Sequence, residues 1–270
     1  MNQSTSEPPA DWNANVYHRV STPQVTWGQE VFDRLPLAGH ETVIDAGCGT
    51  GILTAQLLDR LPNGHVIAID RSPAMLEQAA AYLSPRFGNR VSFVQADVAD
   101  LSVDHPVDAI ISTATFHWVR DHQRLFRHLY AALRPGGRII AQCGGGPNIL
   151  RLREHAETVF AAGRYRERGI PWPNPWEFAS PDLTATRLIE AGFVEVATGL
   201  QGKPTTFGSA GDFKEFVEHV VLREHLPALP DDAARADFMN ALTRLAGADD
   251  PPYTLDYWRL NFSARRPNAR

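Results

Sequence analysis

The chain has 270 residues, of which 43% are hydrophobic and 21% charged, a length that suits one large α/β domain with insertions better than two separate domains. No apolar run approaches the roughly 18 residues of a membrane-spanning helix, and Met1 to Asp11 lacks the basic-then-apolar order of a secretory signal, so we expect a soluble, cytoplasmic protein without membrane contact. The net charge of -5 at pH 7 gives no general attraction to nucleic acid, whose binding domains are usually basic.

Cysteine and lysine usage excludes several chemistries. Cys48 and Cys143 lie far apart and form no CxxC pair, so the sequence predicts neither a disulfide framework nor a metal site. The first lysine is Lys203, whereas a phosphate-binding P-loop needs a lysine directly after its glycines and a pyridoxal enzyme needs one for its Schiff base. Both classes are therefore disfavoured.

Short β-rich runs alternate with helical patterns from residue 41 onward. Strands are predicted at 41–46, 65–70, 91–95, 107–112 and 138–142. Helices are predicted at 52–61, after an N-cap at Ser72 followed by Pro73, and around 125–133. This alternation is typical of βαβ units, so we expect an α/β fold with a parallel sheet and a ligand site at the carboxyl ends of its strands.

The regular alternation breaks after residue 142. Three glycines and a proline begin a predicted insertion over 144–181, which contains Pro171 to Trp176 (PWPNPW). A helix at 183–191 and a strand at 193–198 resume the core, helices are predicted at 212–226 and 231–246, and a single last strand covers 254–264. We therefore divide the chain into a first half of the core at 41–143, the insertion, and a second half at 182–270 with a helical insertion over about 208–248.

The run Asp45 to Gly51 (DAGCGTG), directly after the first strand, is the strongest signal in the sequence. Three alternate glycines let a ligand press on the backbone, where side chains would block its approach. A dinucleotide-binding turn would have its third glycine where Ile52 stands, so the spacing disfavours NAD. Cys48 is expected to touch the ligand rather than act as a nucleophile, because no catalytic partner accompanies it.

Acidic residues close the first three predicted strands at Asp45, Asp70 and Asp97. Asp70 lies about 20 residues beyond the glycines, where a carboxylate can accept hydrogen bonds from both hydroxyls of an adenosine ribose. Asp97 suits an adenine amino group, and Val98 suits the apolar face of the base. The sequence therefore predicts a nucleoside site at this edge of the sheet.

The motifs DAGCGTG, AIDRSPAML, QADV and LRPGGR, spread over residues 41–142, resemble the successive motifs of class I S-adenosylmethionine-dependent methyltransferases. The resemblance implies a Rossmann-like fold with a seven-stranded, mostly parallel sheet, an antiparallel last strand and helical cap insertions. It also implies S-adenosylmethionine as the methyl donor. The residues expected to hold this donor are Asp45, Gly47, Cys48, Gly49, Gly51, Asp70, Arg71, Met75, Asp97, Val98 and Thr113.

The acceptor side is predicted after the fourth strand, at Thr113 to Trp118 (TATFHW). Methyl transfer needs the nucleophile held behind the methyl group with water excluded, so we expect Phe116, His117 and Trp118 to form an aromatic wall. Trp172 and Trp176 lie among the prolines of the insertion. They are predicted either to roof the same pocket or to pin an irregular loop to the core.

The N-terminal stretch 12–19, with Gln24 and Trp27 after it, is rich in aromatic and hydrogen-bonding groups. Together with FHWV at 116–119, it resembles the trans-aconitate methyltransferases and the insect juvenile hormone acid methyltransferases, which esterify carboxylates of small molecules. This resemblance implies a helical lid over residues 1–40 and a cofactor contact from Tyr17. It also implies that Gln24 and Trp118 donate hydrogen bonds to an acceptor carboxylate.

A carboxylate is ionised at pH 7 and needs no general base, and the sequence shows no clear base pair. A hydroxyl or amine acceptor would need a base, for which His117 and His18 are the candidates. We therefore expect O-methylation of a small carboxylic acid, with Gln24, His117 and Trp118 acting on it. N- or C-methylation of a small metabolite, a macromolecular acceptor and a non-catalytic cofactor-binding protein are the alternatives.

Asp250 to Tyr253 (DPPY) resembles the catalytic motif of adenine amino-methyltransferases, but it does not follow the fourth strand, so we reject that role.

Overall fold

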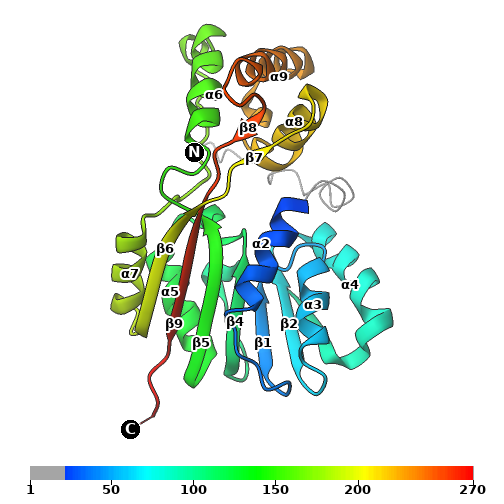
Figure 1. The fold of residues 1–270 in the computed structure, drawn as a ribbon, viewed down its shortest axis with the longest axis vertical. Coiled ribbons are helices and arrows are strands. Elements are labelled where there is room, and N and C mark those ends of the chain that lie inside the picture. The colour runs from blue at the N-terminus through cyan, green and yellow to red at the C-terminus, as the bar shows by residue number, and fades with distance from the viewer. Residues whose placement is uncertain (1–21, 270) are drawn as a thin grey trace, which may run out of the picture.

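The computed structural model describes residues 22–269, which are built around a twisted seven-stranded sheet of order β3-β2-β1-β4-β5-β9-β6 (Figure 1). Its strands are β1 (Thr42–Ala46), β2 (His65–Asp70), β3 (Val91–Gln95), β4 (Val107–Thr113), β5 (Leu133–Gly144), β6 (Val194–Gly202) and β9 (Trp258–Arg265). Strands β1 to β5 pair in parallel, and β9 runs antiparallel between β5 and β6. The predicted seven-stranded, mostly parallel sheet with an antiparallel last strand is confirmed.

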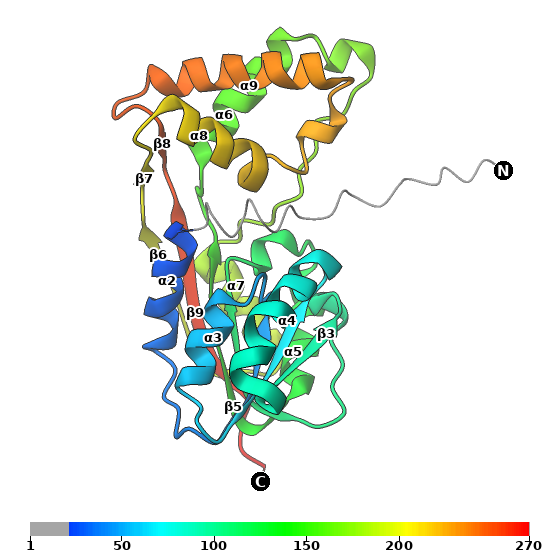
Figure 2. The same ribbon diagram turned by 90° about the vertical axis from the view of Figure 1, so that its right-hand side faces the viewer.

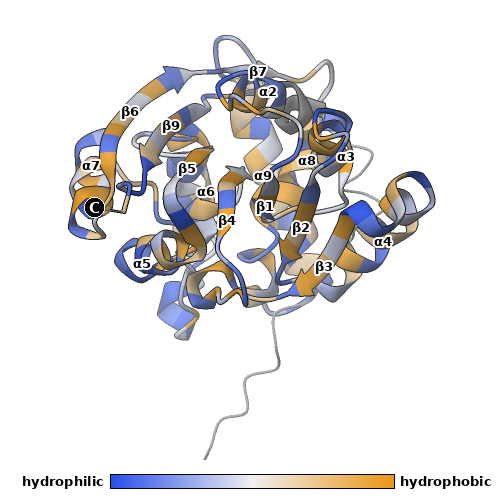
Figure 3. Cartoon of the chain, turned by 90° about the horizontal axis from the view of Figure 1, so that it is seen from below, coloured by the Kyte–Doolittle hydropathy of each residue, from blue (hydrophilic) through white to orange (hydrophobic). Residues whose placement is uncertain are grey.

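Helices cover both faces of this sheet. The covering helices are α2 (Thr22–Phe32), α3 (Ile52–Asp59) and α4 (Pro73–Phe87) on one face, and α5 (His122–Ala132) and α7 (Pro181–Glu190) on the other (Figure 3). The two faces follow from the alternation of side chains along each strand. In β1, Val43 packs with residues of α2, α3 and α4, and its neighbour Ile44 packs with residues of α5. The predicted N-cap is confirmed, since the Ser72 hydroxyl accepts a hydrogen bond from the Met75 backbone N–H at 3.1 Å.

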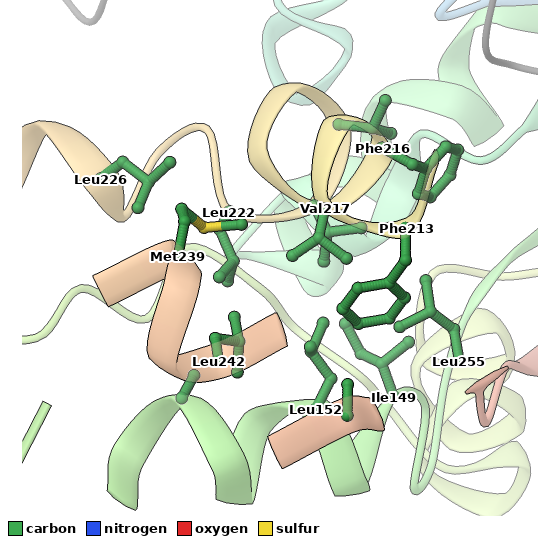
Figure 4. Close-up of a cluster of buried hydrophobic side chains, with 14 of the residues drawn as sticks. Ile149, Leu152, Phe213, Phe216, Val217, Leu222, Leu226, Met239, Leu242 and Leu255 are labelled. Atoms are coloured by element: carbon green, nitrogen blue, oxygen red, sulfur yellow. The ribbon is translucent and has the colours of Figure 1, made fainter. Parts of the chain in front are cut away.

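A second group of helices lies beyond the carboxyl ends of the strands (Figure 2). It consists of α6 (Leu150–Ala162), α8 (Ala210–Phe216), the π-helical turn η5 (Val217–Val221) and α9 (Asp232–Gly247). These helices share a hydrophobic core of their own, in which Leu152, Phe213, Val217 and Leu242 meet (Figure 4). We call this group the helical cap.

Short elements complete the described part of the chain. They are the helical turns η1 (Gly88–Arg90), η2 (Val98–Asp100), η3 (Phe116–Trp118), η4 (Arg166–Arg168) and η6 (Leu226–Ala228), and the antiparallel pair β7 (Thr205–Thr206) and β8 (Thr254–Leu255). Within residues 22–269, no helix has both the length and the apolar character needed to cross a membrane.

Two predicted elements differ from the structure. The single helix expected at 212–226 ends at Phe216 and widens into η5, where the Leu222 N–H donates to the carbonyl of Val217, five residues earlier, at 2.8 Å. The single strand expected at 254–264 is broken into β8 and β9. The break arises because Asn148 Oδ1 accepts a hydrogen bond from the Trp258 N–H at 2.9 Å, and Asp256 O accepts one from the Ile149 N–H at 3.1 Å.

Candidate active site

A cavity with roughly 1080 Å³ of empty space, part of it open to solvent, lies between the carboxyl ends of the strands and the helical cap. We call the part lined by the ends of β1, β2 and β3 the cofactor end. We call the part lined by the turn after β4, the cap and β9 the acceptor end. The predicted site residues among its lining are Gly47, Gly49, Asp70, Arg71, Met75, Asp97, Val98, Thr113, His117, Trp118 and Trp176.

The glycine turn after β1 has a backbone that only glycine adopts without strain. Gly47, Gly49 and Gly51 have φ angles of +86°, +53° and +83°, in the left-handed region that side chains disfavour. A Cβ atom on Gly47 would lie 2.0 Å from Thr115 Oγ1, on the turn after β4. The two turns therefore approach too closely for any side chain at this position, and the backbone itself forms this wall of the cavity.

Asp70 is held rigidly beside the glycine turn. Its two carboxylate oxygens accept hydrogen bonds from the N–H groups of Gly49 and Ser72, both at 2.9 Å. A carboxylate has about four acceptor positions, so capacity remains for the two hydroxyls of a ribose. Burial raises the pKa of Asp70, and the Ser72 and Gly49 N–H groups oppose that shift.

The end of β3 contributes an acid and an apolar surface. Asp97 is exposed and caps η2 by accepting a hydrogen bond from the Ala99 N–H at 2.8 Å, whereas Val98 is buried. Both line the cavity. The backbone cradle at Gly47, the oriented carboxylate of Asp70 and this acid-valine pair fit a nucleoside cofactor.

Three predicted cofactor residues lie behind the lining instead of in it. The buried carboxyl of Asp45 accepts a hydrogen bond from Thr54 Oγ1 at 2.7 Å, and burial raises its pKa to about 6. Cys48 is buried in the core, where burial and the neighbouring carboxylates raise the pKa of its thiol. Gly51 is the N-cap of α3. All three therefore support the glycine turn from the side that faces away from the cavity.

The acceptor end is walled by aromatic side chains from distant segments. Trp118, in η3, lies 6.0 Å from Trp176 between ring centroids, and Trp176 stacks on Phe178 at 5.3 Å. The carbonyl of His117 accepts a hydrogen bond from the Glu177 N–H at 2.8 Å, which ties the 172–178 segment to η3. The insertion therefore contributes directly to the cavity.

His117 is buried beside this wall in a defined hydrogen-bonding state. Its Nδ1 lies 3.3 Å from the donating N–H of Gly144. Burial lowers the pKa of His117 well below its ordinary value, with smaller contributions from Arg259 and His122. The ring is therefore neutral at pH 7, and because Nδ1 accepts, the remaining proton is assigned to Nε2.

The structure separates other predicted acceptor residues from the cavity lining. Phe116 lies in the core on the face of the sheet that α5 covers, stacked on Phe262 with 6.0 Å between ring centroids. Trp172 packs inside the cap between Phe160 and His225. Tyr17 and His18 lie outside the described residues. Gln24 falls within α2, but its side chain is not described.

Arg259 is a site residue that the sequence analysis missed. It lies on β9 between Gly144 of β5 and Gln201 of β6, is 2% exposed, and lines the cavity. Its guanidinium stacks over the Trp27 ring at 4.6 Å, which brings α2 to the acceptor end. A charged residue within the mostly apolar and aromatic run YWRLNF was the available sequence signal.

Residues 43–137 match the family model described as a methyltransferase domain. Two solved structures share the fold. One is Haemonchus contortus phosphoethanolamine N-methyltransferase 2 with S-adenosylhomocysteine (TM-score 0.61, 17% identity, 95% of this chain and 57% of that one). The other is a Bacillus halodurans methyltransferase (TM-score 0.62, 15% identity, 90% of this chain and 100% of that one). The sheet, the glycine turn and the family model define a class I methyltransferase that uses S-adenosylmethionine.

Similarity along nearly the whole chain narrows this class. A trans-aconitate 2-methyltransferase of Methylobacterium radiotolerans is 30% identical over 256 residues, which cover 90% of this chain and 92% of the relative. One of Deinococcus radiodurans is 29% identical over 264 residues, covering 95% and 98%. A malonyl-[acyl-carrier protein] O-methyltransferase of Ilyobacter polytropus is 32% identical over 153 residues, covering 57% and 56%. The chain belongs to the family of the trans-aconitate 2-methyltransferases.

Proposed function

We propose that this methyltransferase esterifies a carboxylate of a small-molecule acceptor. The observation that carries the proposal is Arg259, a buried guanidinium in the lining of the acceptor end. Arginine presents a planar fork of donors that matches a carboxylate. The names of two relatives, which specify trans-aconitate and a malonyl group, support a carboxylate acceptor.

The cofactor end would hold S-adenosylmethionine through the backbone of Gly47 and Gly49, with Asp70 accepting hydrogen bonds from the ribose hydroxyls. Asp97 and Val98 would hold the adenine by its amino group and its face. When bound, the cofactor would supply an electrophilic methyl group to the carboxylate oxygen, with the S–C bond breaking and its electron pair remaining on sulfur.

The state of His117 supports an acceptor that needs no deprotonation. Its Nδ1 accepts a hydrogen bond from the Gly144 N–H, and its lowered pKa disfavours the protonated ring. A general base needs a lone pair directed at the acceptor, whereas His117 offers an Nε2–H donor. We therefore assign His117 a hydrogen bond to the carboxylate, alongside Trp118 and Gln24.

We further propose that the helical cap and residues 144–181 close over the acceptor, and that the N-terminal lid acts through Trp27, since Val31 and Phe32 of the same helix pack in the core beside the sheet. The stacking of Trp27 on Arg259 at 4.6 Å supports a lid at the acceptor end. Closure would exclude water, which strengthens the pairing between the guanidinium and the carboxylate.

The proposal is tested by incubating the protein with a donor labelled in its methyl group and a panel of carboxylic acids, phenols and amines. We expect the label in a methyl ester, so alkaline hydrolysis should regenerate the unlabelled acid. Transfer to amines or phenols alone would contradict the proposal.

A variant pair tests the acceptor contact. Trp118→Phe keeps an aromatic ring but removes the indole N–H donor, so we expect KM for the acid to rise while affinity for S-adenosylhomocysteine stays unchanged. The control is Trp258→Phe, at a half-exposed position on β9, which should change neither quantity. If Trp118→Phe weakened affinity for S-adenosylhomocysteine by as large a factor as it raised KM for the acid, the assignment of Trp118 to the acceptor contact would be wrong.

A further inference from the structure

Side chains of the acceptor end meet around Gly144, the last residue of β5. The N–H group of Gly144 donates a hydrogen bond to His117 Nδ1 at 3.3 Å. A Cβ atom on Gly144 would lie 2.7 Å from Asn148 Nδ2 and 2.8 Å from Phe178 Cε1. His117, Asn148 and Phe178 all line the cavity. The Asn148 amide and the Phe178 ring therefore occupy the space that a side chain at this position would fill.

Arg259 extends from the sheet beside the same point. It lies opposite Gly144 in the antiparallel register of β5 and β9. Side chains of directly opposite residues leave a sheet on the same face, with Cβ atoms about 4.5–5.5 Å apart. The Asn148 amide, next to the Cβ position of Gly144, therefore takes the place of a cross-strand neighbour of Arg259. Asn148 and Arg259 are each 2% exposed, and both line the cavity.

The orientation of the Asn148 amide is fixed by its oxygen. Asn148 Oδ1 accepts a hydrogen bond from the Trp258 N–H at 2.9 Å. Only the oxygen of an amide can accept such a bond, so this contact assigns the two ends of the side chain. The two N–H groups on Nδ2 are therefore directed to the Gly144 side of the amide. Because Trp258 directly precedes Arg259, the amide is anchored to the strand segment that carries the guanidinium.

The groups around Gly144 donate hydrogen bonds. The Asn148 Nδ2 and the Arg259 guanidinium carry donors and no acceptor, and His117 presents Nε2–H because its Nδ1 accepts from Gly144. A carboxylate has lone pairs for all of these donors. A carboxamide in the same place would turn its own NH2 group against a donor, and sites of this kind reject such an analogue strongly.

We propose that Asn148 is a specificity-determining residue, whose Nδ2 donates a hydrogen bond to the acceptor carboxylate while the guanidinium of Arg259 holds the same carboxylate from β9. This inference rests on the proposed carboxylate methylation, and it adds the side chain that discriminates a carboxylate from a carboxamide. The anchoring of Asn148 by Trp258 orders the donor before the acceptor binds, which lowers the entropy lost on binding.

The experiment measures binding by calorimetry in the presence of saturating S-adenosylhomocysteine, so that no turnover is required. The probes are trans-aconitate, fumarate and cinnamate, with fumaramide and cinnamide as the matching neutral amides. We expect the wild-type protein to bind at least one of the acids, and to bind fumarate or cinnamate at least roughly ten-fold more tightly than the corresponding amide.

Asn148→Asp is the test variant, because it keeps the shape of the side chain and an oxygen for the Trp258 N–H while replacing the Nδ2 donors by an acceptor. We expect acid affinity to fall at least roughly ten-fold. We expect the amides to bind more tightly than they bind the wild type, since their NH2 group can donate to the new carboxylate. Unchanged affinity for S-adenosylhomocysteine reports folding.

Asn240→Asp is the matched control. Asn240 is exposed on α9 of the cap, and its Oδ1 also accepts a hydrogen bond, from Lys214 Nζ at 2.9 Å. This variant makes the same chemical change away from the cavity, so it should bind acids and amides as the wild type does.

Gly144→Ala tests the same contact without changing any donor side chain, and it carries the test if Asn148→Asp does not fold. The added methyl group must displace the Asn148 amide or the Phe178 ring, so acid affinity should fall by roughly ten-fold or more. The control is Gly199→Ala on β6, where no atom lies within 4 Å of the Cβ position, and its acid affinity should match the wild type.

The outcomes separate this inference from the proposed function. Unchanged acid affinity in Asn148→Asp or in Gly144→Ala overturns the contact of Asn148 with the acceptor. A loss of acid affinity in Asn148→Asp with unchanged amide affinity shows that the new carboxylate acts only by pairing with Arg259, which also overturns the contact. Both results leave carboxylate methylation standing. A wild-type protein that binds none of the acids overturns the proposed function itself.

Discussion

Substituting Gly47 by alanine tests the cradle in the glycine turn. The backbone at Gly47 has φ +86°, which costs a residue with a side chain roughly 1–2 kcal/mol. The new methyl group would lie 2.0 Å from Thr115 Oγ1 and 2.4 Å from Cγ2, where real Cβ contacts essentially never fall below 3.0 Å. The turn after β1 or the turn after β4 must therefore move by about 1 Å, a displacement that can cost a site roughly 100-fold.

Gly169→Ala separates the steric effect from backbone strain. Gly169 has a similar φ of +78°, but no atom lies within 4 Å of its Cβ position. We expect both variants to lose roughly 1–2 kcal/mol of unfolding free energy from strain, measured by denaturant titration. Only Gly47→Ala should weaken calorimetric binding of S-adenosylhomocysteine, by roughly 10- to 100-fold. Equal affinity in the two variants would refute the cradle.

Two further predictions concern the segment that carries Glu224 and His225. Burial between the indoles of Trp172 and Trp176 lowers the pKa of His225 to about 4. Below about pH 6.5 the unfolded chain takes up a proton that the native ring rejects, so stability should fall by up to about 1.4 kcal/mol per pH unit toward pH 4. His225→Phe should flatten that slope in pH-dependent denaturation, and an unchanged slope would contradict the assignment. Glu224→Gln removes the ion pair with Arg71 and should speed dissociation of S-adenosylhomocysteine by roughly two- to five-fold; an unchanged rate in stopped-flow measurements would show that the pair does not hold the site closed.

Local sequence was sufficient for the core of the fold. Strand β2 was predicted with its observed bounds, and the Ser72–Pro73 start of α4 was identified from its capping chemistry alone. Both signals are local, because a buried strand needs a short apolar run and a helix start needs a nearby acceptor for its first N–H groups. The sequence analysis predicted one strand in place of β8 and β9, because the Asn148 side chain that binds between them is distant in sequence.

The two ends of the cavity differed in how far sequence could predict them. The cofactor end follows strand ends, so acids such as Asp70 and Asp97 could be placed from periodicity and spacing. The acceptor end is assembled from segments far apart in the chain. Arg259 reaches it only because β9 inserts between β5 and β6, and Phe116 faces the core because the η3 turn rotates it away from its neighbours His117 and Trp118.

The arrangement of the cofactor is tested most directly by a crystal structure of the protein with S-adenosylhomocysteine bound. We expect both ribose hydroxyls within hydrogen-bond distance of the Asp70 carboxylate, the adenine beside Asp97 and Val98, and the sulfur facing Arg259. A nucleoside bound elsewhere, or a ribose turned away from Asp70, would contradict the assignment of this cavity as the methyl-transfer site.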